Sequence, residues 1–338
     1  MMLPRKRGPT IRDVANAADV STATVSKLMA GRQRFSTEVE ERIRKAVQDL
    51  GWSTNPMASA IMTGRTGNIG IVVIDLRSPN FNRVLDGVTR AAVAANLNFI
   101  VADVAQASAQ DLGPIKALAR RVDGLIVSAR LPAHIIAALF EQETPLVFYG
   151  GPSLYADYHS VRCDNFHAGR LLGDHLRDRG FRKISYLGFP TALSNAERWR
   201  GLRSAFDSVE VVLEVHEASA LIPEEGERLA SVCLQQEGLP HAVVSFSDSL
   251  ALGLLSEARR LGIKVPDQVA VAAFDNTVYG RLQFPSLTSV DLMSEEVGER
   301  AMQCLSDVMR GNLFTGDAVL NGKLVVREST SGGLPPPD

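Results

Sequence analysis

Apolar residues in the first fifty or so positions recur with the spacing of amphipathic helices. A short first helix is indicated by apolar residues at i, i+3, i+4 and i+7, namely Ile11, Val14, Ala15 and Ala18. Ser21 can cap a second helix from Thr22 to about Ala30, and Ser36 can cap a third that ends at Leu50. Two short helices joined by a tight turn, with a third as scaffold, predict a helix-turn-helix domain.

The second helix has two unlike faces. Thr22, Ala23, Ser26 and Lys27 share one face at helical spacing, and mostly apolar side chains occupy the other. Small side chains allow close approach to base edges, and Lys27 can donate to guanine acceptors in a major groove. An ordinary amphipathic helix with a solvated face remains the alternative on this segment alone.

Beyond residue 67 the pattern changes to short apolar runs separated by helical stretches. The run 68–74 is uniformly apolar and rich in β-branched residues, which is typical of a parallel strand buried on both faces. Further strands are predicted at 99–102, 124–127, 145–148, 183–187, 243–246 and 269–274. The alternation predicts an α/β body of doubly wound parallel sheets. The strands are too many for one compact sheet, so residues 160–165 are the predicted crossing into a second lobe.

Between head and body lies a short apolar segment from Asn55 to Gly64. Asn55 is a suitable N-cap, Pro56 suits the first helical position, and Gly64 suits the end of a helix. About seven helical residues fall below the ~12–15 at which an isolated helix is even marginal in water, so this hinge needs support from a partner. A plain linker with its apolar residues against the body is the alternative.

The balance of charged residues changes near residue 67, where the hydrophobic pattern also changes. Residues 1–66 contain 11 Lys and Arg against 6 Asp and Glu, whereas the remainder contains 25 against 32. A basic head on an acidic body suits a polyanion as the partner of the head.

Cysteine spacing and missing motifs exclude several classes of protein. Cys163, Cys233 and Cys304 lie far apart without C-x-x-C spacing, so we interpret them as reduced core thiols. The sequence shows no signal-peptide pattern and no run of ~18 apolar residues, which favours a cytoplasmic protein without a membrane partner. It has no G-x-S-x-G, P-loop, G-x-G-x-x-G or H-E-x-x-H motif. We therefore expect no enzyme activity, no cofactor and no metal.

Three segments, Thr10–Ala15, Val20–Lys27 and Gly51–Pro56, carry a resemblance to a known family. A helix-turn-helix followed by an Asn-Pro segment and an α/β body resembles the lac repressor/galactose repressor family of transcriptional regulators. The resemblance implies base contacts in the major groove by Thr22, Ala23 and Lys27, and contacts at or near phosphates by Thr10, Ser21, Thr24 and Ser26. The family usually has Gly where Asp19 stands and Arg where Lys27 stands. Because Asp tolerates a left-handed backbone, we expect the turn to be kept.

For the hinge, the resemblance implies a helix in the minor groove at the operator centre, beside the same helix of a second subunit. Asn55, Ala58 and Ile61 would contact DNA there, with Ile61 in place of the usual Leu as the wedge between base steps. Ser59 stands where relatives usually carry Arg. The tail 332–338 is expected to be disordered and lacks the heptads of a tetramerising helix, which favours a homodimer.

For the body, the resemblance implies a periplasmic-binding-protein-like fold in which the chain crosses between the lobes three times. The last crossing is expected near Val319, before a final strand from Gly322 to Val326. The expected organisation is an all-α head (1–53), a hinge (54–66) and an α/β body (67–331), with lobe one at about 67–163 and 292–318 and lobe two at about 164–291 and 319–331.

Ligands in such folds bind at the carboxyl ends of the strands, here facing each other across a cleft. The candidate effector-binding residues are Asp75, Phe81, Tyr149, Asp164, Arg198, Ser247, Ser249 and Asp275. In relatives the Arg of an Arg-x-x-Gly pattern, here Arg198, and an Asp after a strand, here Asp275, bind the hydroxyls of a sugar-like ligand. A guanidinium offers donors and a carboxylate offers acceptors, which together complement a polyol. A salt bridge or a loop cap is the alternative for each, and Asp248 is expected to cap a helix.

The leading hypothesis is a ligand-responsive repressor of carbohydrate-related genes, located at the nucleoid in the cytoplasm. It would bind double-stranded, pseudo-palindromic operator DNA as a homodimer, with a sugar or sugar derivative as effector. A solute-binding protein of a transport system is suggested by the body alone, but the basic head and the lack of a signal peptide disfavour it. An α/β enzyme is disfavoured because no catalytic constellation is present.

Overall fold

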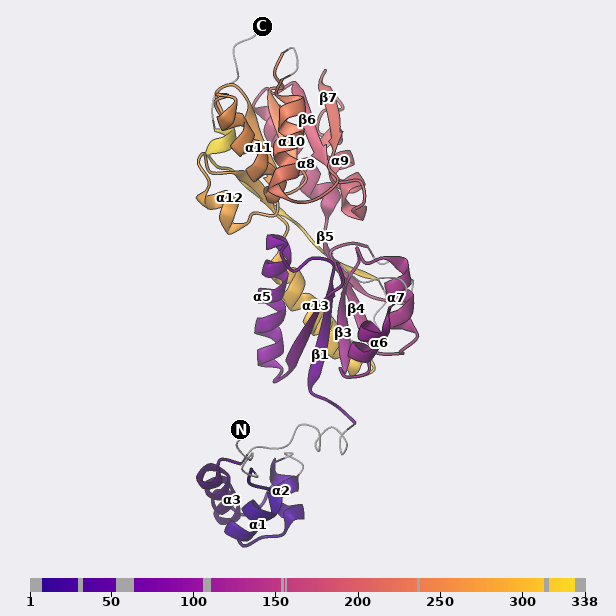
Figure 1. Ribbon diagram of the computed structural model, residues 1–338, viewed down its shortest axis with the longest axis vertical. Helices are drawn as coiled ribbons and strands as arrows, with labels where there is room; N and C mark the ends of the chain where they lie inside the picture. Colours follow the sequence, from indigo (N-terminus) through magenta and orange to yellow (C-terminus); the bar gives the residue numbers. More distant parts are fainter. Residues whose placement is uncertain are drawn as a thin grey trace, which may run out of the picture. The chain divides into compact units, whose positions relative to one another are not determined.

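The computed structural model describes residues 8–29, 33–52, 64–105, 111–152, 155, 157–235, 238–312 and 316–331. The chain divides after Gly67 into a helical head and an α/β body, and each is described by itself (Figure 1). The predicted hinge residues 55–63 and the tail 332–338, predicted to be disordered, lie outside the described residues.

Three helices form the head: α1 (Ile11–Ala17), α2 (Thr22–Met29) and α3 (Thr37–Leu50). Asp19, in the turn between α1 and α2, adopts a left-handed backbone with a φ of 51°, so the prediction for this turn is confirmed. A small apolar core lies between the helices and consists of Val14, Ala15, Ala18, Val25, Ile43 and Ala46. Trp52 packs against this core after the last helix. The head is therefore a compact helix-turn-helix unit with its own core.

The first lobe of the body is built on a six-stranded parallel sheet with the order β11-β5-β4-β3-β1-β2. Its strands are β1 (Asn68–Val73), β2 (Asn98–Asp103), β3 (Gly124–Ser128), β4 (Leu146–Tyr149), β5 (Ser160–Cys163) and β11 (Asp317–Leu320). One face packs against α5 (Pro79–Ala94) and α13 (Ser294–Met309), and the other against α6 (Gly113–Ala119) and α7 (Ala133–Phe140). Helices on both faces explain why the strands are continuously apolar.

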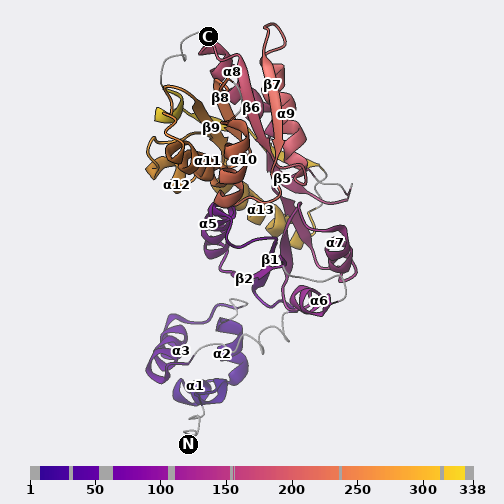
Figure 2. The same ribbon diagram turned by 45° about the horizontal axis from the view of Figure 1, so that its top comes forward.

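The second lobe repeats this plan with the sheet order β12-β10-β9-β8-β6-β7, and β7 lies at one edge (Figure 2). Its strands are β6 (Lys183–Gly188), β7 (Val212–Glu217), β8 (Ala242–Ser245), β9 (Ala270–Phe274), β10 (Thr288–Asp291) and β12 (Lys323–Val325). One face packs against α8 (Asn165–Asp178) and α9 (Leu193–Ser204), and the other against α10 (Pro223–Cys233) and α11 (Asp248–Arg260). The short α12 (Val278–Leu282) and a 3-10 turn (Glu328–Thr330) complete the lobe. β12 runs antiparallel to β10, so this sheet is parallel in all but one pair.

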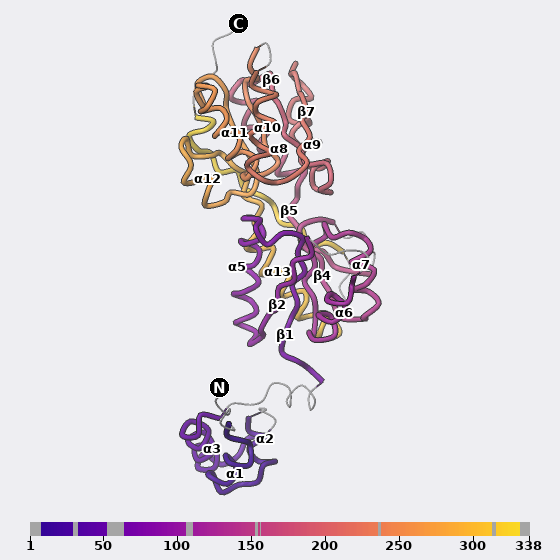
Figure 3. The backbone as a smooth tube through the Cα atoms, in the orientation of Figure 1, coloured from indigo at the N-terminus to yellow at the C-terminus, as the bar shows by residue number. Residues whose placement is uncertain are grey.

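The chain passes between the lobes three times, from β5 to α8, from β10 to α13 and from β11 to β12 (Figure 3). The third passage was expected near Val319. Val319 instead belongs to β11 and pairs with Arg162 in the first sheet, so the chain crosses slightly later, at Asn321 and Gly322.

Three helix pairs of the body pack through reciprocal glycines. A Cβ atom at Gly169 of α8 would lie 2.1 Å from the carbonyl oxygen of Arg198, and one at Gly201 of α9 would lie 2.0 Å from that of Phe166. The same arrangement joins α5 to α13 and α10 to α11, through Gly87 and Gly298 and through Gly226 and Gly253. The glycine of the Arg-x-x-Gly pattern thus lets α9 approach α8 closely, which fixes the helix that carries Arg198.

None of the helices in the described ranges is both long and apolar enough to cross a bilayer. Within the same residues, no group of three His, Cys, Asp or Glu side chains could hold a metal ion. The cysteines are free, and burial raises the pKa of Cys163 to about 11 and that of Cys233 to about 12. These two thiols are therefore protonated near neutral pH.

Candidate functional site

The residues of α2 predicted to bind DNA bases lie on one exposed surface of the head. Thr22, Ala23 and Lys27 are exposed and Ser26 is half-buried, whereas Val25 is fully buried in the head core. The helix therefore turns its apolar side inward and offers short polar side chains and one cation to solvent. Such a face fits a major groove, where small side chains permit close approach and a lysine can donate to guanine.

Thr10, Ser21 and Thr24, predicted to lie near phosphates, are engaged at helix starts. The Thr10 hydroxyl oxygen accepts from the Asp13 amide at 3.4 Å, and the Asp13 carboxylate accepts from the Thr10 amide at 2.7 Å, which completes a capping box. The Ser21 hydroxyl oxygen accepts from the Thr24 amide at 3.1 Å. These bonds fix the first turns of α1 and α2 and so set the position of the exposed α2 surface.

The hinge residues Asn55, Ala58 and Ile61 lie outside the described residues, and their contacts in a minor groove stay predictions. Gly64, the expected end of that helix, has a φ of 68°. Glycine adopts this backbone without strain, so the residue suits the end of a helix.

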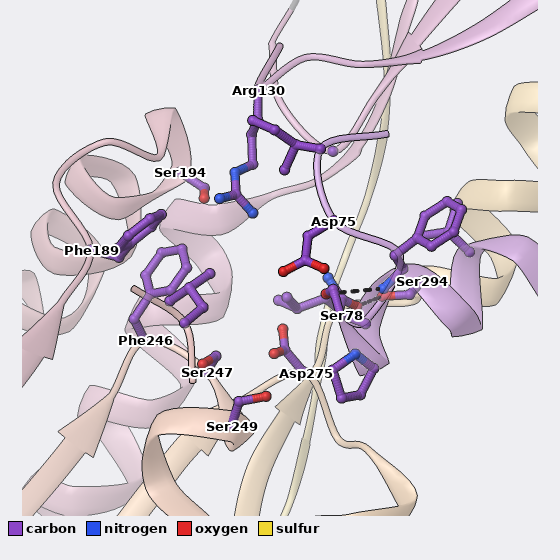
Figure 4. A pocket seen from close by; sticks show the side chains of 18 of the residues that line it. Asp75, Ser78, Arg130, Phe189, Ser194, Phe246, Ser247, Ser249, Asp275 and Ser294 are labelled. Carbon is purple, nitrogen blue, oxygen red and sulfur yellow. Dashed lines mark hydrogen bonds between the residues drawn. The ribbon is translucent and has the colours of Figure 1, made fainter. Parts of the chain in front are cut away.

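A cavity of about 750 Å³ lies between the two lobes of the body (Figure 4). Carboxyl ends of strands and the first turns of the following helices form its wall, as doubly wound sheets lead one to expect. Seven of the eight predicted effector residues line it: Asp75, Phe81, Tyr149, Arg198, Ser247, Ser249 and Asp275. The volume lies within the range of about 300–1,000 Å³ that small-molecule sites occupy.

Arg198 reaches the cavity from α9 and is held by neutral groups. Its Nε donates to Oδ1 of Asn165 at 3.0 Å, and Nη1 donates to the carbonyl oxygen of Phe246 at 2.7 Å. The guanidinium carbon also lies 4.3 Å and 4.8 Å from the ring centroids of Phe246 and Phe274. These contacts fix the plane of the guanidinium without neutralising its charge, so Arg198 remains available to a ligand oxygen.

Asp275 follows β9 directly and has an unusual backbone. Its φ is 112°, and Asn276 after it has a φ of 51°, a pair of positive values that non-glycine residues rarely adopt. Burial raises the pKa of the Asp275 carboxyl group to about 8, although the positive charge of Arg198 opposes the shift. The carboxyl group is therefore mostly protonated at neutral pH and can donate a hydrogen bond as well as accept one.

The Asp275 turn is held from two sides. Arg83 of α5 donates from Nη1 to the carbonyl oxygen of Asp275 at 2.7 Å, and its Nη2 lies 3.1 Å from Oδ2 of Asp291. On the other side the buried Asp248 carboxylate accepts from the Thr277 amide at 2.6 Å and from the Ser289 hydroxyl at 2.7 Å. Lobe one therefore contributes to the position of a lobe-two residue.

Two assignments from the sequence need correction. Asp164 is not among the residues that line the cavity, and its carboxylate caps α8 by accepting from the His167 amide at 2.8 Å. Asp248 is not the cap of α11. Ser247 has that role, with its hydroxyl oxygen accepting from the Leu250 amide at 3.3 Å, and it lines the cavity as well.

The wall from lobe one begins at Asp75, directly beyond β1. Its carboxylate is paired with Arg77, with Nε 3.0 Å from Oδ1, and this hydrogen bond lowers the pKa of Asp75. Phe81 and Tyr149 add an aromatic surface, with ring centroids 6.5 Å apart. Burial raises the pKa of the Tyr149 hydroxyl, so that group stays protonated and can donate.

Sequence reasoning missed several side chains of the cavity, among them Arg130, Phe189, Ser194 and Phe246. Phe189 follows β6 directly and Arg130 lies two residues beyond β3, and both strands were predicted. Applying the strand-end rule to every strand would have found them. Phe189 and Phe246 form an aromatic pair with centroids 5.8 Å apart, which gives lobe two an apolar surface beside its polar groups.

Comparison with known proteins identifies both parts of the chain. Residues 10–55 match the family described as bacterial regulatory proteins, lacI family, and residues 173–330 match a periplasmic binding protein-like domain. The repressor PurR of Pectobacterium carotovorum is 27% identical over 336 residues, which cover 96% of this chain and 97% of PurR. The repressor CytR of Escherichia coli K12 is 27% identical over 329 residues, which cover 95% and 96% of the two chains.

Solved structures share the fold along the whole chain. The Lac repressor dimer bound to operator and the anti-inducer ONPF has a TM-score of 0.83 at 22% identity, covering 96% of this chain and 99% of that one. The complex of the transcriptional regulator CelR with cellobiose has a TM-score of 0.70 at 25% identity, covering 95% and 99%. The chain is thus similar along its whole length to repressors of the LacI family of bacterial regulatory proteins, whose DNA-binding domain its head matches, and it is a ligand-responsive, DNA-binding transcriptional regulator, not an enzyme.

Proposed function

We propose that this protein represses transcription by binding a pseudo-palindromic operator as a homodimer, and that a sugar or sugar derivative in the cavity changes this binding. The observation that carries the proposal is the presence in one chain of the exposed α2 surface with Lys27 and of a polar cavity lined by Arg198 and Asp275. Because such a regulator works on chromosomal DNA, we expect it at the nucleoid in the cytoplasm.

The homodimer follows from the size of the head. One short recognition helix contacts only a few base pairs, so two heads in adjacent major grooves are needed for a specific site, and their two-fold symmetry makes that site pseudo-palindromic. The Lac repressor relative is a dimer bound to operator, which supports the same assembly here.

The sugar effector is supported by the mixture of groups in the cavity. Arg198 offers donors, Asp275 offers a donor and an acceptor, and the serines at 247 and 249 offer hydroxyl groups. Phe246 adds a flat apolar surface beside them. Related proteins have been solved with cellobiose and with ribose, and such ligands combine hydroxyl groups with apolar ring faces. The target genes would then concern carbohydrates.

Coupling between the cavity and DNA requires two arrangements of the lobes that differ in affinity for the ligand. The hinge is too short to be stable alone, so DNA on one side and the body on the other can both order it. Whether the ligand releases or promotes DNA binding depends on which arrangement it prefers. A solute-binding role is supported by the body alone and leaves the helix-turn-helix head without a use.

The DNA-binding part is tested by replacing Lys27. Lys27→Ala should weaken binding to an operator selected in vitro by about 1–3 kcal/mol while leaving non-specific binding nearly unchanged, because a base contact carries the specificity. Lys45→Ala, an exposed lysine on α3, is the matched control and should have little effect. Equal losses on operator and random DNA, measured by fluorescence anisotropy, would refute base reading by Lys27.

A further inference from the structure

A second arginine, Arg130, reaches into the cavity from lobe one. It stands just beyond β3, and its guanidinium extends toward Ser194 and Phe189 of lobe two (Figure 4). The guanidinium carbon lies 5.3 Å from the Phe189 ring centroid. Among the described residues, no carboxylate comes within the 4.0 Å of an ion pair with this group. Arg130 is thus a cation at the cavity without an acidic partner in this part of the chain.

Two other half-buried arginines of the body, Arg83 and Arg162, are neutralised by carboxylates of the protein. Arg83 pairs with Asp291 at 3.1 Å, and Arg162 pairs with Asp317 at 2.9 Å. A cation withdrawn from water without a counter-charge is unfavourable, and burial accordingly lowers the pKa of Arg130. The contact with the Phe189 ring offsets only part of this cost.

Among the described residues, the acidic groups of the cavity attract Arg130 only from beyond ion-pair distance. Asp75 is already paired with Arg77 at 3.0 Å. Asp275 is mostly protonated at neutral pH, since burial raises its pKa to about 8. Glu224 lines the cavity but is exposed on the first turn of α10. Arg198 adds a second positive charge that only neutral groups contact. Arg130 and Arg198 are therefore the two cations of the cavity lining that no described carboxylate contacts at ion-pair distance.

We infer that the effector is an anionic sugar whose carboxylate or phosphate oxygens bind the Arg130 guanidinium, while its hydroxyl groups face Arg198 and Asp275. This inference rests on the proposed effector function of the cavity and narrows the class of ligand. A guanidinium matches carboxylate and phosphate oxygens alike through paired N–H donors. The Ser194 hydroxyl lies beside the guanidinium and can donate to the same oxyanion (Figure 4).

The test uses isothermal titration of the full-length protein at constant ionic strength with matched ligands. The set contains D-glucose, D-gluconate, D-glucuronate and D-glucose 6-phosphate, and the corresponding D-galactose series. We expect at least one anionic member to bind about 30-fold or more tightly than its neutral parent, as a charge-assisted hydrogen bond allows. The carboxylate and phosphate members decide between a sugar acid and a sugar phosphate.

Variants at position 130 connect this preference to the arginine. Arg130→Gln should reduce the ratio of anionic to neutral affinity about tenfold or more, while Arg130→Lys should retain part of it because the charge is kept. Arg120→Gln is the matched control, because Arg120 contacts Gln142 on the surface of the same lobe and should leave the ratio unchanged. The inference is overturned if neutral parents bind at least as tightly as every anionic member, if no anionic member binds, or if Arg130→Gln leaves the ratio unaltered.

Failure of the inference differs from failure of the proposed function. Operator affinity that responds to a neutral sugar would sustain the function and refute the anionic ligand. Tight binding of an anionic sugar that depends on Arg130, without any change in operator affinity, would sustain the inference and refute the regulatory role.

Discussion

The two lobes present unlike walls to the same cavity. On lobe two the protein itself fixes the polar groups, since Arg198 is bonded to Asn165 and Phe246. On lobe one, Arg130 extends into the cavity without an acidic partner among the described residues. Lobe two is therefore preorganised to orient a ligand, whereas lobe one offers a charge whose partner the ligand must supply. A ligand that joins both walls would favour one arrangement of the lobes over others.

Arg83 is a second arginine of lobe one, and it contacts lobe two through the Asp275 turn. It belongs to α5 of lobe one, yet it donates to the carbonyl oxygen of Asp275 at 2.7 Å and pairs with Asp291 at 3.1 Å. A movement of lobe one would therefore change the support of a ligand-facing residue on lobe two. A change in the contact between the lobes would therefore also change the ligand cavity.

The largest expected effect on ligand affinity comes from a change in the preorganised wall of lobe two. Arg198→Ala should weaken ligand binding by about 3 kcal/mol, roughly 100-fold, because it removes a charged donor and leaves Asn165 and the Phe246 carbonyl without their partner. Arg260→Ala, which removes a surface arginine paired with Glu257 of the same lobe, is the control and should bind normally. Isothermal titration measures both, and circular dichroism checks folding. An unchanged affinity of Arg198→Ala would remove lobe two from the site.

A smaller loss of ligand affinity should follow from a variant that displaces the backbone of Arg198 but removes no side chain that contacts the ligand. Gly169→Ala places a Cβ atom against the Arg198 carbonyl oxygen, so we expect a loss of about 2 kcal/mol in the free energy of unfolding and about tenfold in ligand affinity. Leu139→Ala removes a fully buried side chain of α7 that does not line the cavity, and should cost a similar amount of stability with less effect on affinity. Equal losses of affinity in both variants would contradict the special role of lobe-two packing.

The smallest effect concerns the pH dependence of stability. The folded-state pKa of Asp275, about 8, lies above its ordinary value of 3.8, so unfolding releases a proton between these values. The contribution of this group to stability is complete below about pH 4 and is lost as the pH rises toward 8. Asp275→Asn keeps the shape and tolerates a positive φ. The variant should therefore lose less stability than the wild type between pH 6 and pH 7, by about 1 kcal/mol in ligand-free urea unfolding. Parallel pH profiles would show that Asp275 is ionised in the folded protein.

The sequence predicted most of the inner strands of the two sheets. β1 and β9 read as continuous apolar runs because helices cover both faces of each sheet. The edge strands β7 and β11 were missed because their exposure alternates, and Glu214 and His216 of β7 conceal the apolar pattern. The short inner strands β5 and β10 were missed as well, whereas the edge strand β2 was predicted.

The sequence predicted at which positions along the chain site residues occur. It did not predict which of those side chains point into the cavity. Asp164 and Ser247 both precede helices and both act as caps, yet only Ser247 also lines the cavity. A capping residue and a ligand contact have the same residue types at the same strand-to-helix junction, so sequence alone does not separate them. The protonation of Asp275 depends on burial by residues distant in the chain, which no local pattern encodes.

The central claim, that the cavity controls the head, is tested most directly by one titration. Operator affinity is measured by fluorescence anisotropy with and without a saturating concentration of the tightest-binding sugar, in the wild type and in Arg198→Ala. We expect the sugar to change the operator Kd of the wild type about tenfold or more and to leave that of Arg198→Ala unchanged. The same operator Kd with and without the saturating sugar in the wild type would contradict the account.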